Sequence, residues 1–184
     1  MHFRNNYAND RGGAIFIDDD NVALINVIVE NNTAKNAGGG VWVDSLSDIT
    51  FKGKCIVKDN NCISNSAFRN VTLQKGVSSQ AYVYSAGLYA GSYIGINSDS
   101  SSSDIKISIK MSKYQMQYFH ADSGTLIMRD ETEENAEMVV TASLFGNGIF
   151  WVSVGIGVVG IGAAIGIIIY RKKVGPNKKK VEEE

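Results

Sequence analysis

Residues 3–18 read FRNNYANDRGGAIFID, residues 29–44 read VENNTAKNAGGGVWVD, and the two stretches align without a gap at an offset of 26 residues. Each copy has an aromatic or aliphatic start, an asparagine pair and a glycine pair. The repeated residues are Phe3, Asn5, Asn6, Gly12 and Gly13 in the first copy, and Val29, Asn31, Asn32, Gly38 and Gly39 in the second. A third, weaker copy begins at residues 55–60 at an offset of 28 but reaches no glycine pair.

Each repeat consists of short runs with high strand propensity, separated by Asn, Gly and Asp, and no run has the period of a helix. Short strands joined by tight corners form a coil. When coils stack, equivalent residues lie about 4.8 Å apart, so each strand pairs in parallel with its copies in the neighbouring coils. Ile15, Ile17, Val41 and Val43 would then fill a continuous interior. The sequence therefore predicts an all-β parallel solenoid over residues 1–64.

The asparagine and glycine pairs are expected at the corners of the coils. Asparagine tolerates the left-handed backbone conformation, and its amide can donate to and accept from the asparagine one coil away, which predicts a ladder. Glycine suits a corner where φ is positive or where the backbone is crowded.

The run Phe3-Arg4-Asn5-Asn6, followed by Gly12-Gly13-Ala14-Ile15, resembles the FxxN and GGAI repeats of the polymorphic membrane proteins. The resemblance covers residues 3–62, although the second unit has Val29 in place of Phe and the third has neither motif intact. It implies a right-handed parallel β-helix, exposed at the cell surface, that functions in adhesion or surface display. The expected partner is an extracellular protein or glycan.

Strand-like alternation continues beyond the repeats, in residues 71–73, 81–84, 105–109 and 125–128. A solenoid needs an atypical terminal unit to cover its last open strand edge. We therefore predict a β-rich cap over residues 65–129, followed by an acidic stalk over residues 130–147.

An apolar stretch near the C-terminus predicts a single transmembrane helix over residues 148–170. Residues 138–170 contain no Asp, Glu, Lys or Arg, and a helix of the 22 residues 149–170 would be about 33 Å long, enough to cross the lipid bilayer. A buried helix of a soluble protein is the alternative. Six basic residues follow in residues 171–184, which predicts a cytoplasmic tail, an N-terminal domain outside, and a plasma-membrane location.

Small residues four positions apart predict that this helix associates with a second copy of itself. The pairs are Ser153 and Gly157, Gly160 and Ala164, and Gly162 and Gly166. They lie on more than one face, and the general glycine enrichment of membrane helices is the alternative explanation.

The charge balance argues against nucleic acid as a partner. Without the tail, the chain has 12 basic and 16 acidic residues, a net charge of −4.

Two kinds of covalent feature are open from the sequence. Cys55 and Cys62 either form one disulfide or are two small buried residues. Asn31 and Asn70 begin N-glycosylation sequons, and Asn70 is preferred because Asn31 is assigned to the ladder.

The sequence predicts no enzymatic activity, no cofactor and no metal site. The only carboxylate cluster, Asp18-Asp19-Asp20, falls where the repeat predicts an exposed turn, and His2 and His120 have no recognisable nucleophile partner. The alternative is a membrane-tethered polysaccharide lyase or hydrolase, because parallel β-helices also carry such enzymes.

The start of the chain predicts that further coils precede it. Residues 1–11 are polar and contain no export signal, the first repeat begins at Phe3 without a capping segment, and stable solenoids need about three repeats or more.

Overall fold

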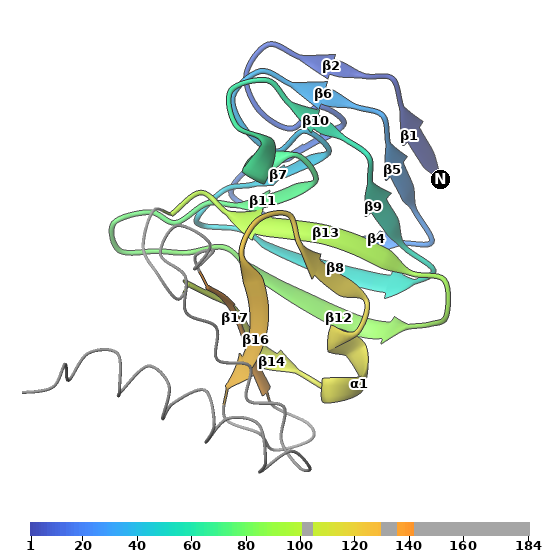
Figure 1. Ribbon diagram of the computed structural model, residues 1–184, viewed down its shortest axis with the longest axis vertical. Coiled ribbons are helices and arrows are strands. Elements are labelled where there is room, and N and C mark those ends of the chain that lie inside the picture. The colour runs from blue at the N-terminus through green and yellow to red at the C-terminus, as the bar shows by residue number, and fades with distance from the viewer. Residues whose placement is uncertain (101–104, 130–135, 142–184) are drawn as a thin grey trace, which may run out of the picture. The chain divides into compact units, whose positions relative to one another are not determined.

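The computed structural model describes residues 1–100, 105–129 and 136–141. The chain divides into two units, Met1–Asn147 and Gly148–Glu184, and all the described residues lie in the first. This unit is all-β, as predicted, and its main part is a parallel β-solenoid of about four turns (Figure 1). The expected membrane helix lies outside the described residues. Among those described, no helix has the length and apolar character needed to cross a membrane.

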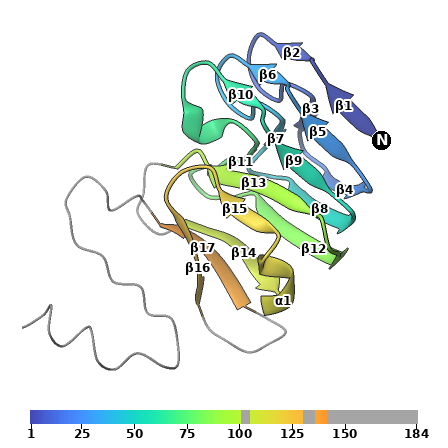
Figure 2. The ribbon, with the colours of Figure 1, turned by 45° about the vertical axis from the view of Figure 1, so that its right-hand side comes forward.

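Each of the first three coils supplies four short strands. Coil 1 contains β1 (His2–Arg4), β2 (Tyr7–Ala8), β3 (Ile15–Ile17) and β4 (Asn21–Ile25). Coil 2 contains β5 (Ile28–Glu30), β6 (Thr33–Ala34), β7 (Val41–Val43) and β8 (Asp48–Gly53). Coil 3 contains β9 (Ile56–Lys58), β10 (Asn61–Cys62), the 3₁₀-helix η1 (Ser66–Phe68), β11 (Val71–Leu73) and β12 (Tyr82–Leu88). Equivalent strands stack into the parallel ladders β1-β5-β9, β2-β6-β10, β3-β7-β11 and β4-β8-β12 (Figure 2).

The strand register follows the sequence repeat. Phe3 pairs with Val29 and Val29 pairs with Val57, while Ile15 pairs with Val41. Val29, Val41 and Val57 are fully buried in the interior of the coils. The predicted repeat offsets and the predicted apolar interior are therefore both confirmed.

The two glycines of each pair serve different needs. Gly12 and Gly38 have left-handed φ values of 63° and 61°. Gly13 and Gly39 are crowded, because a Cβ added to Gly13 would lie 2.0 Å from the carbonyl oxygen of Gly39. In the third coil, which has no glycine pair, the backbone carbonyls of Phe68 and Arg69 accept from the Gly39 and Gly40 amides.

The strand β13 (Tyr93–Ser98) joins two walls of the solenoid. Its residues Tyr93 and Ile94 pair with β9, and its residues Ile96–Ser98 pair with β11. Among the strands that the structure describes, the corner ladder β2-β6-β10 consequently gains no fourth member. β9 pairs with the start of β13 and β11 with its end, and the two strands diverge from each other (Figure 2).

The remaining strands cover the end of the solenoid. β15 (Phe119–Ala121) pairs in parallel with β13, so parallel pairing continues well beyond residue 64. β14 (Ile105–Met111), β17 (Ala136–Thr141) and β16 (Thr125–Arg129) form an antiparallel sheet, and the short helix α1 (Lys113–Met116) follows β14.

The prediction of a stalk over residues 130–147 is wrong for residues 136–141. These residues form β17, the central strand of the antiparallel sheet, and Met138, Val139 and Val140 are buried. The acidic composition of residues 130–137 masked the apolar run that follows it.

Candidate ligand-binding groove

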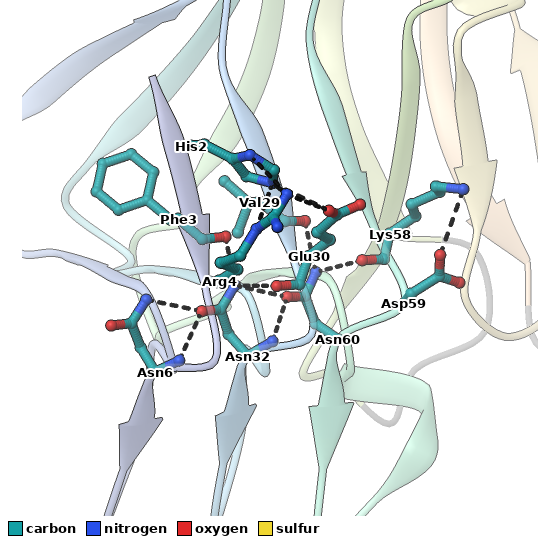
Figure 3. Close-up of polar contacts among 10 residues, drawn as sticks. All are labelled: His2, Phe3, Arg4, Asn6, Val29, Glu30, Asn32, Lys58, Asp59 and Asn60. Atoms are coloured by element: carbon teal, nitrogen blue, oxygen red, sulfur yellow. Dashed lines mark hydrogen bonds and ion pairs between the residues drawn. The ribbon is translucent and has the colours of Figure 1, made fainter.

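A row of asparagine side chains follows the corner at the ends of β1, β5 and β9 (Figure 3). The Oδ1 of Asn32 accepts from the backbone N–H and the Nδ2 of Asn6, at 3.0 and 2.8 Å. The Oδ1 of Asn60 accepts from the same two groups of Asn32, at 3.0 and 2.9 Å. An asparagine ladder is present, as predicted, but in the second coil it contains Asn32 and not Asn31, and it has one direction because each asparagine donates toward the next coil.

The first residue of each pair takes the left-handed backbone conformation, which is the other role predicted for asparagine. Asn5 and Asn31 both have a left-handed φ of 57°, and Asp59 takes the same conformation in the third coil with a φ of 54°. The two predicted roles are therefore divided between neighbouring residues.

The ladder extends past the three repeats to a carboxylate. The N–H and Nδ2 of Asn60 donate to the Oδ1 of Asn70, at 3.2 and 3.1 Å. Asn70 in turn donates from its N–H and its Nδ2 to the two carboxylate oxygens of Asp122, at 2.9 and 2.6 Å. An ionised carboxylate only accepts hydrogen bonds, so Asp122 can end a row of donors and satisfy both groups of Asn70.

A glycine makes room for this last contact. Gly95 lies in β13, and a Cβ added to it would lie 2.3 Å from the Nδ2 of Asn70 and 2.6 Å from the Oδ1 of Asp122. Both distances are far below a van der Waals contact. The contact between Asn70 and Asp122 therefore requires a residue without a side chain at position 95.

Asp122 is nearly inaccessible, with a side chain that is only 3% exposed. Burial raises the pKa of its carboxyl group, while the hydrogen bonds from Asn70 and the charge of Arg69 act in the opposite direction. The Nε of Arg69 lies 3.4 Å from the Oδ1 of Asp122, and its Nη2 donates to the Asp122 backbone carbonyl at 3.3 Å. Arg69 therefore covers the buried carboxylate, and its own side chain remains 47% exposed.

A half-open groove of about 600 Å³ lies over this end of the ladder, where β9 and β11 diverge from β13. Only two of its lining residues, Ile56 and Gly91, lack a polar side chain. The polar lining residues are Lys58, Asp59, Asn60, Arg69, Asn70, Tyr93 and Asp122.

Tyr93 gives the groove its one aromatic side chain. Its ring stacks on that of His120, with the centroids 4.0 Å apart and the planes 12° apart, and it is 40% exposed. His120 pairs with Gly95 in the strand register, so no side chain at position 95 separates the two rings. Burial lowers the pKa of His120, which favours the neutral imidazole.

The accessible groups of the groove suit hydrogen bonding to a polar ligand. Lys58 and Arg69 are donors, Asp59 is an acceptor, and Tyr93 combines a ring surface with a hydroxyl. Both oxygens of Asp122 already accept from Asn70. The most buried carboxylate of the groove is therefore already hydrogen-bonded within the protein and holds the corner together.

The two cysteines lie at different corners as free, buried thiols. The Sγ of Cys55 contacts the Leu24 and Lys52 carbonyls, and that of Cys62 contacts the Asn36 carbonyl. Of the two readings left open by the sequence, the structure has the buried residues rather than the disulfide.

The accessibility of the two sequons is the reverse of what the sequence favoured. Asn70 is 4% exposed and its amide nitrogen is bound to Asp122, whereas Asn31 is exposed because Asn32 occupies the ladder. Glycosylation itself stays a prediction, and Asn31 is the sequon that an enzyme could reach.

The acidic turn brings Asp18 and Asp19 close to an aspartate of the next coil. Asp18 and Asp19 bring carboxylate oxygens within 4.8 Å of that of Asp44, and the three side chains are exposed or half-buried. Exposed acidic groups of this kind are common without an ion. Asp20 is exposed.

The sequence did not identify the groove, although it contained one signal for it. Gly95 interrupts an otherwise apolar strand, Tyr-Ile-Gly-Ile, and an isolated glycine in a strand marks a bulge or a close approach. No repeated pattern in the sequence includes Arg69, Tyr93 or Asp122, so the repeats could not identify them.

The chain matches no protein-family description, no curated protein and no solved structure.

Proposed function

We propose that this chain is a membrane-anchored, non-enzymatic surface protein that binds saccharides in the groove over Asp122. The observation that carries the proposal is the combination of a fixed, exposed aromatic ring, that of Tyr93, with charged and amide groups around a half-open cavity. Binding sites combine apolar surface with a few well-placed polar groups, and here the polar groups dominate.

A saccharide fits this lining because it is polar at its hydroxyl groups and apolar on the faces of its ring. Lys58 and Arg69 can donate to hydroxyl oxygens, and Asp59 can accept from hydroxyl protons. The ring of Tyr93 can pack against an apolar sugar face, and its stack on His120 holds it in place without a ligand.

Binding is favoured over hydrolysis or elimination by the state of the buried carboxylate. A catalytic acid or base needs an oxygen within hydrogen-bond reach of the substrate. Asp122 is 3% exposed, both its oxygens accept from Asn70, and Arg69 lies over it.

The membrane anchor is supported by the sequence. The uncharged residues 149–170 are long enough to span a bilayer, and the basic residues that follow favour a cytoplasmic tail. The repeats support the adhesin-like, right-handed β-helix that the resemblance to polymorphic membrane proteins implies.

The proposal is tested by probing a glycan array with the purified full chain in detergent. We expect binding that Tyr93→Ala abolishes and that Tyr114→Ala, a control at another exposed tyrosine, leaves intact. Binding that is insensitive to Tyr93→Ala would place the site elsewhere. Turnover of any bound glycan that is lost in Asp122→Asn would favour the enzyme instead.

A further inference from the structure

We infer that the groove is one end of a longer binding strip on the outer face of β1-β5-β9, and that its ligand is an extended polysaccharide chain. The inference rests on the proposed function, because it starts from saccharide binding at Tyr93. It adds the form of the ligand and the residues that hold it outside the groove.

The first part of the strip is a column of side chains in strand register that is aromatic or aliphatic from β13 to β5 and ends at a histidine in β1. Tyr93 pairs with Ile56, Ile56 with Ile28, and Ile28 with His2. The residues that follow each of them in the strands point into the core, so this column points outward. Ile28 and Ile56 are half-buried and lie outside the apolar core, and Ile56 also lines the groove.

The second part is a column of charged side chains, one from each of β1, β5 and β9 (Figure 3). Arg4 pairs with Glu30 and Glu30 with Lys58 in the strand register. The Nη2 of Arg4 lies 3.2 Å from the Oε1 of Glu30, and the Nε2 of His2 lies 3.0 Å from the same oxygen. Lys58 belongs to the groove, so this column also ends there.

Within each column, successive residues lie about 4.8 Å apart, because they belong to neighbouring paired strands. A linear polymer that lies across the strands would therefore meet Tyr93 at the groove, an apolar and a charged residue on each of β9 and β5, and the polar residues His2 and Arg4 on β1. Its ring faces could pack on Ile28, Ile56 and Tyr93, while its hydroxyl groups could bond to the charged column. Because this column carries both donors and acceptors, it matches hydroxyl groups, which are both.

A polysaccharide is favoured over a folded protein partner because the apolar part of the strip is only one residue wide in each strand. Protein interfaces are broader patches that bury a cluster of large side chains at their centre. Here the apolar residue of β5 and that of β9 each have a charged neighbour two positions along the strand.

The test is a chain-length series measured by isothermal titration calorimetry on the full chain in detergent. The probes are chito-, cello-, xylo- and galacturono-oligosaccharides of one to six units. We expect the Kd for the series that binds to fall about tenfold for each added subsite until the strip is filled, because each subsite adds an apolar contact, a hydrogen-bonded contact or both.

Two variants locate the strip. Ile28→Thr and Arg4→Gln should each raise the Kd of the hexamer about tenfold and leave that of the dimer unchanged, whereas Tyr93→Ala should weaken both. Ile25→Thr, at an exposed isoleucine of β4, is the matched control. The two strip variants change side chains with exposed surface, and circular dichroism checks that each is folded.

The outcomes separate the two proposals. Equal Kd values for dimer and hexamer, or a hexamer that is insensitive to both strip variants, would overturn the strip and leave saccharide binding in the groove intact. Binding of none of the four series, with capture of a protein ligand that Ile28→Thr weakens, would overturn both proposals.

Discussion

Asn70 donates both its backbone N–H and its side-chain amide to the carboxylate of Asp122, 52 residues later in the chain. This contact continues the asparagine ladder of the repeats, from Asn60 to Asn70, into a segment that does not repeat. It also forms the floor of the groove, so the repeat and the candidate site share one hydrogen-bond network.

The ladder should contribute strongly to stability. Asn32→Ala removes the acceptor of Asn6 and the donor to Asn60, and the site is fully buried. We expect the free energy of unfolding to fall by roughly 3 kcal/mol, since each unsatisfied buried group costs about 1–3 kcal/mol. The control is Asn31→Gly, which keeps the left-handed conformation at an exposed position and should change stability by less than about 1 kcal/mol. Urea denaturation measures both, and equal losses would show that the ladder adds nothing.

Gly95→Ala tests whether the floor of the groove needs a residue without a side chain. The added Cβ would force Asn70 and Asp122 apart, so we expect both a loss of stability of about 1–3 kcal/mol and a loss of saccharide binding. Gly76→Ala is the control, because the nearest atoms there are serine hydroxyl groups, which can rotate away. Thermal denaturation and binding are measured on both variants, and a stable, fully binding Gly95→Ala would remove the role assigned to this glycine.

The buried carboxylate predicts a pH dependence of stability. Burial raises the pKa of Asp122 in the folded state, so the folded state binds this proton more tightly than the unfolded state. The wild-type chain therefore gains stability relative to Asp122→Asn as the pH falls through the folded pKa toward the ordinary value near 3.8. Urea denaturation of both proteins at a series of pH values measures this difference. If the stability of the wild type relative to Asp122→Asn instead decreases as the pH falls, the hydrogen bonds of Asn70 and the charge of Arg69 lower the Asp122 pKa more than burial raises it.

The proposed membrane anchor predicts the orientation of the chain in cells. Protease added to intact cells should spare a C-terminal epitope tag, because the basic tail favours the cytoplasm. A tag digested before permeabilisation would contradict the proposed orientation.

The solenoid could be predicted from the sequence because its determinants recur. The asparagine pairs, the glycine pairs and the apolar runs appear twice at one offset, and the strand register follows that offset. The assignment of Asn31 to the ladder was wrong, since Asn32 occupies it, because the two neighbouring asparagines are chemically identical and only the fold distinguishes them.

The groove could not be predicted because it forms where the repeat ends. Asn70 and Asp122 meet only because β13 joins two walls and carries β15 with it, and no periodic pattern marks such a junction. The strand β17 was missed for a related reason: it follows an acidic run, and its apolar face needs the partners β14 and β16 to explain it.

The most direct test of saccharide binding at the end of the ladder is a nuclear magnetic resonance titration of the ¹⁵N-labelled full chain in detergent micelles. The ligand is the oligosaccharide that binds most tightly on the array. We predict that the largest shift changes fall on the Asn70 side-chain amide and on the backbone amides of Gly91, Tyr93 and Gly95. Changes confined to the acidic turn at Asp18 and Asp44, with the Asn70 amide unmoved at saturation, would contradict the account.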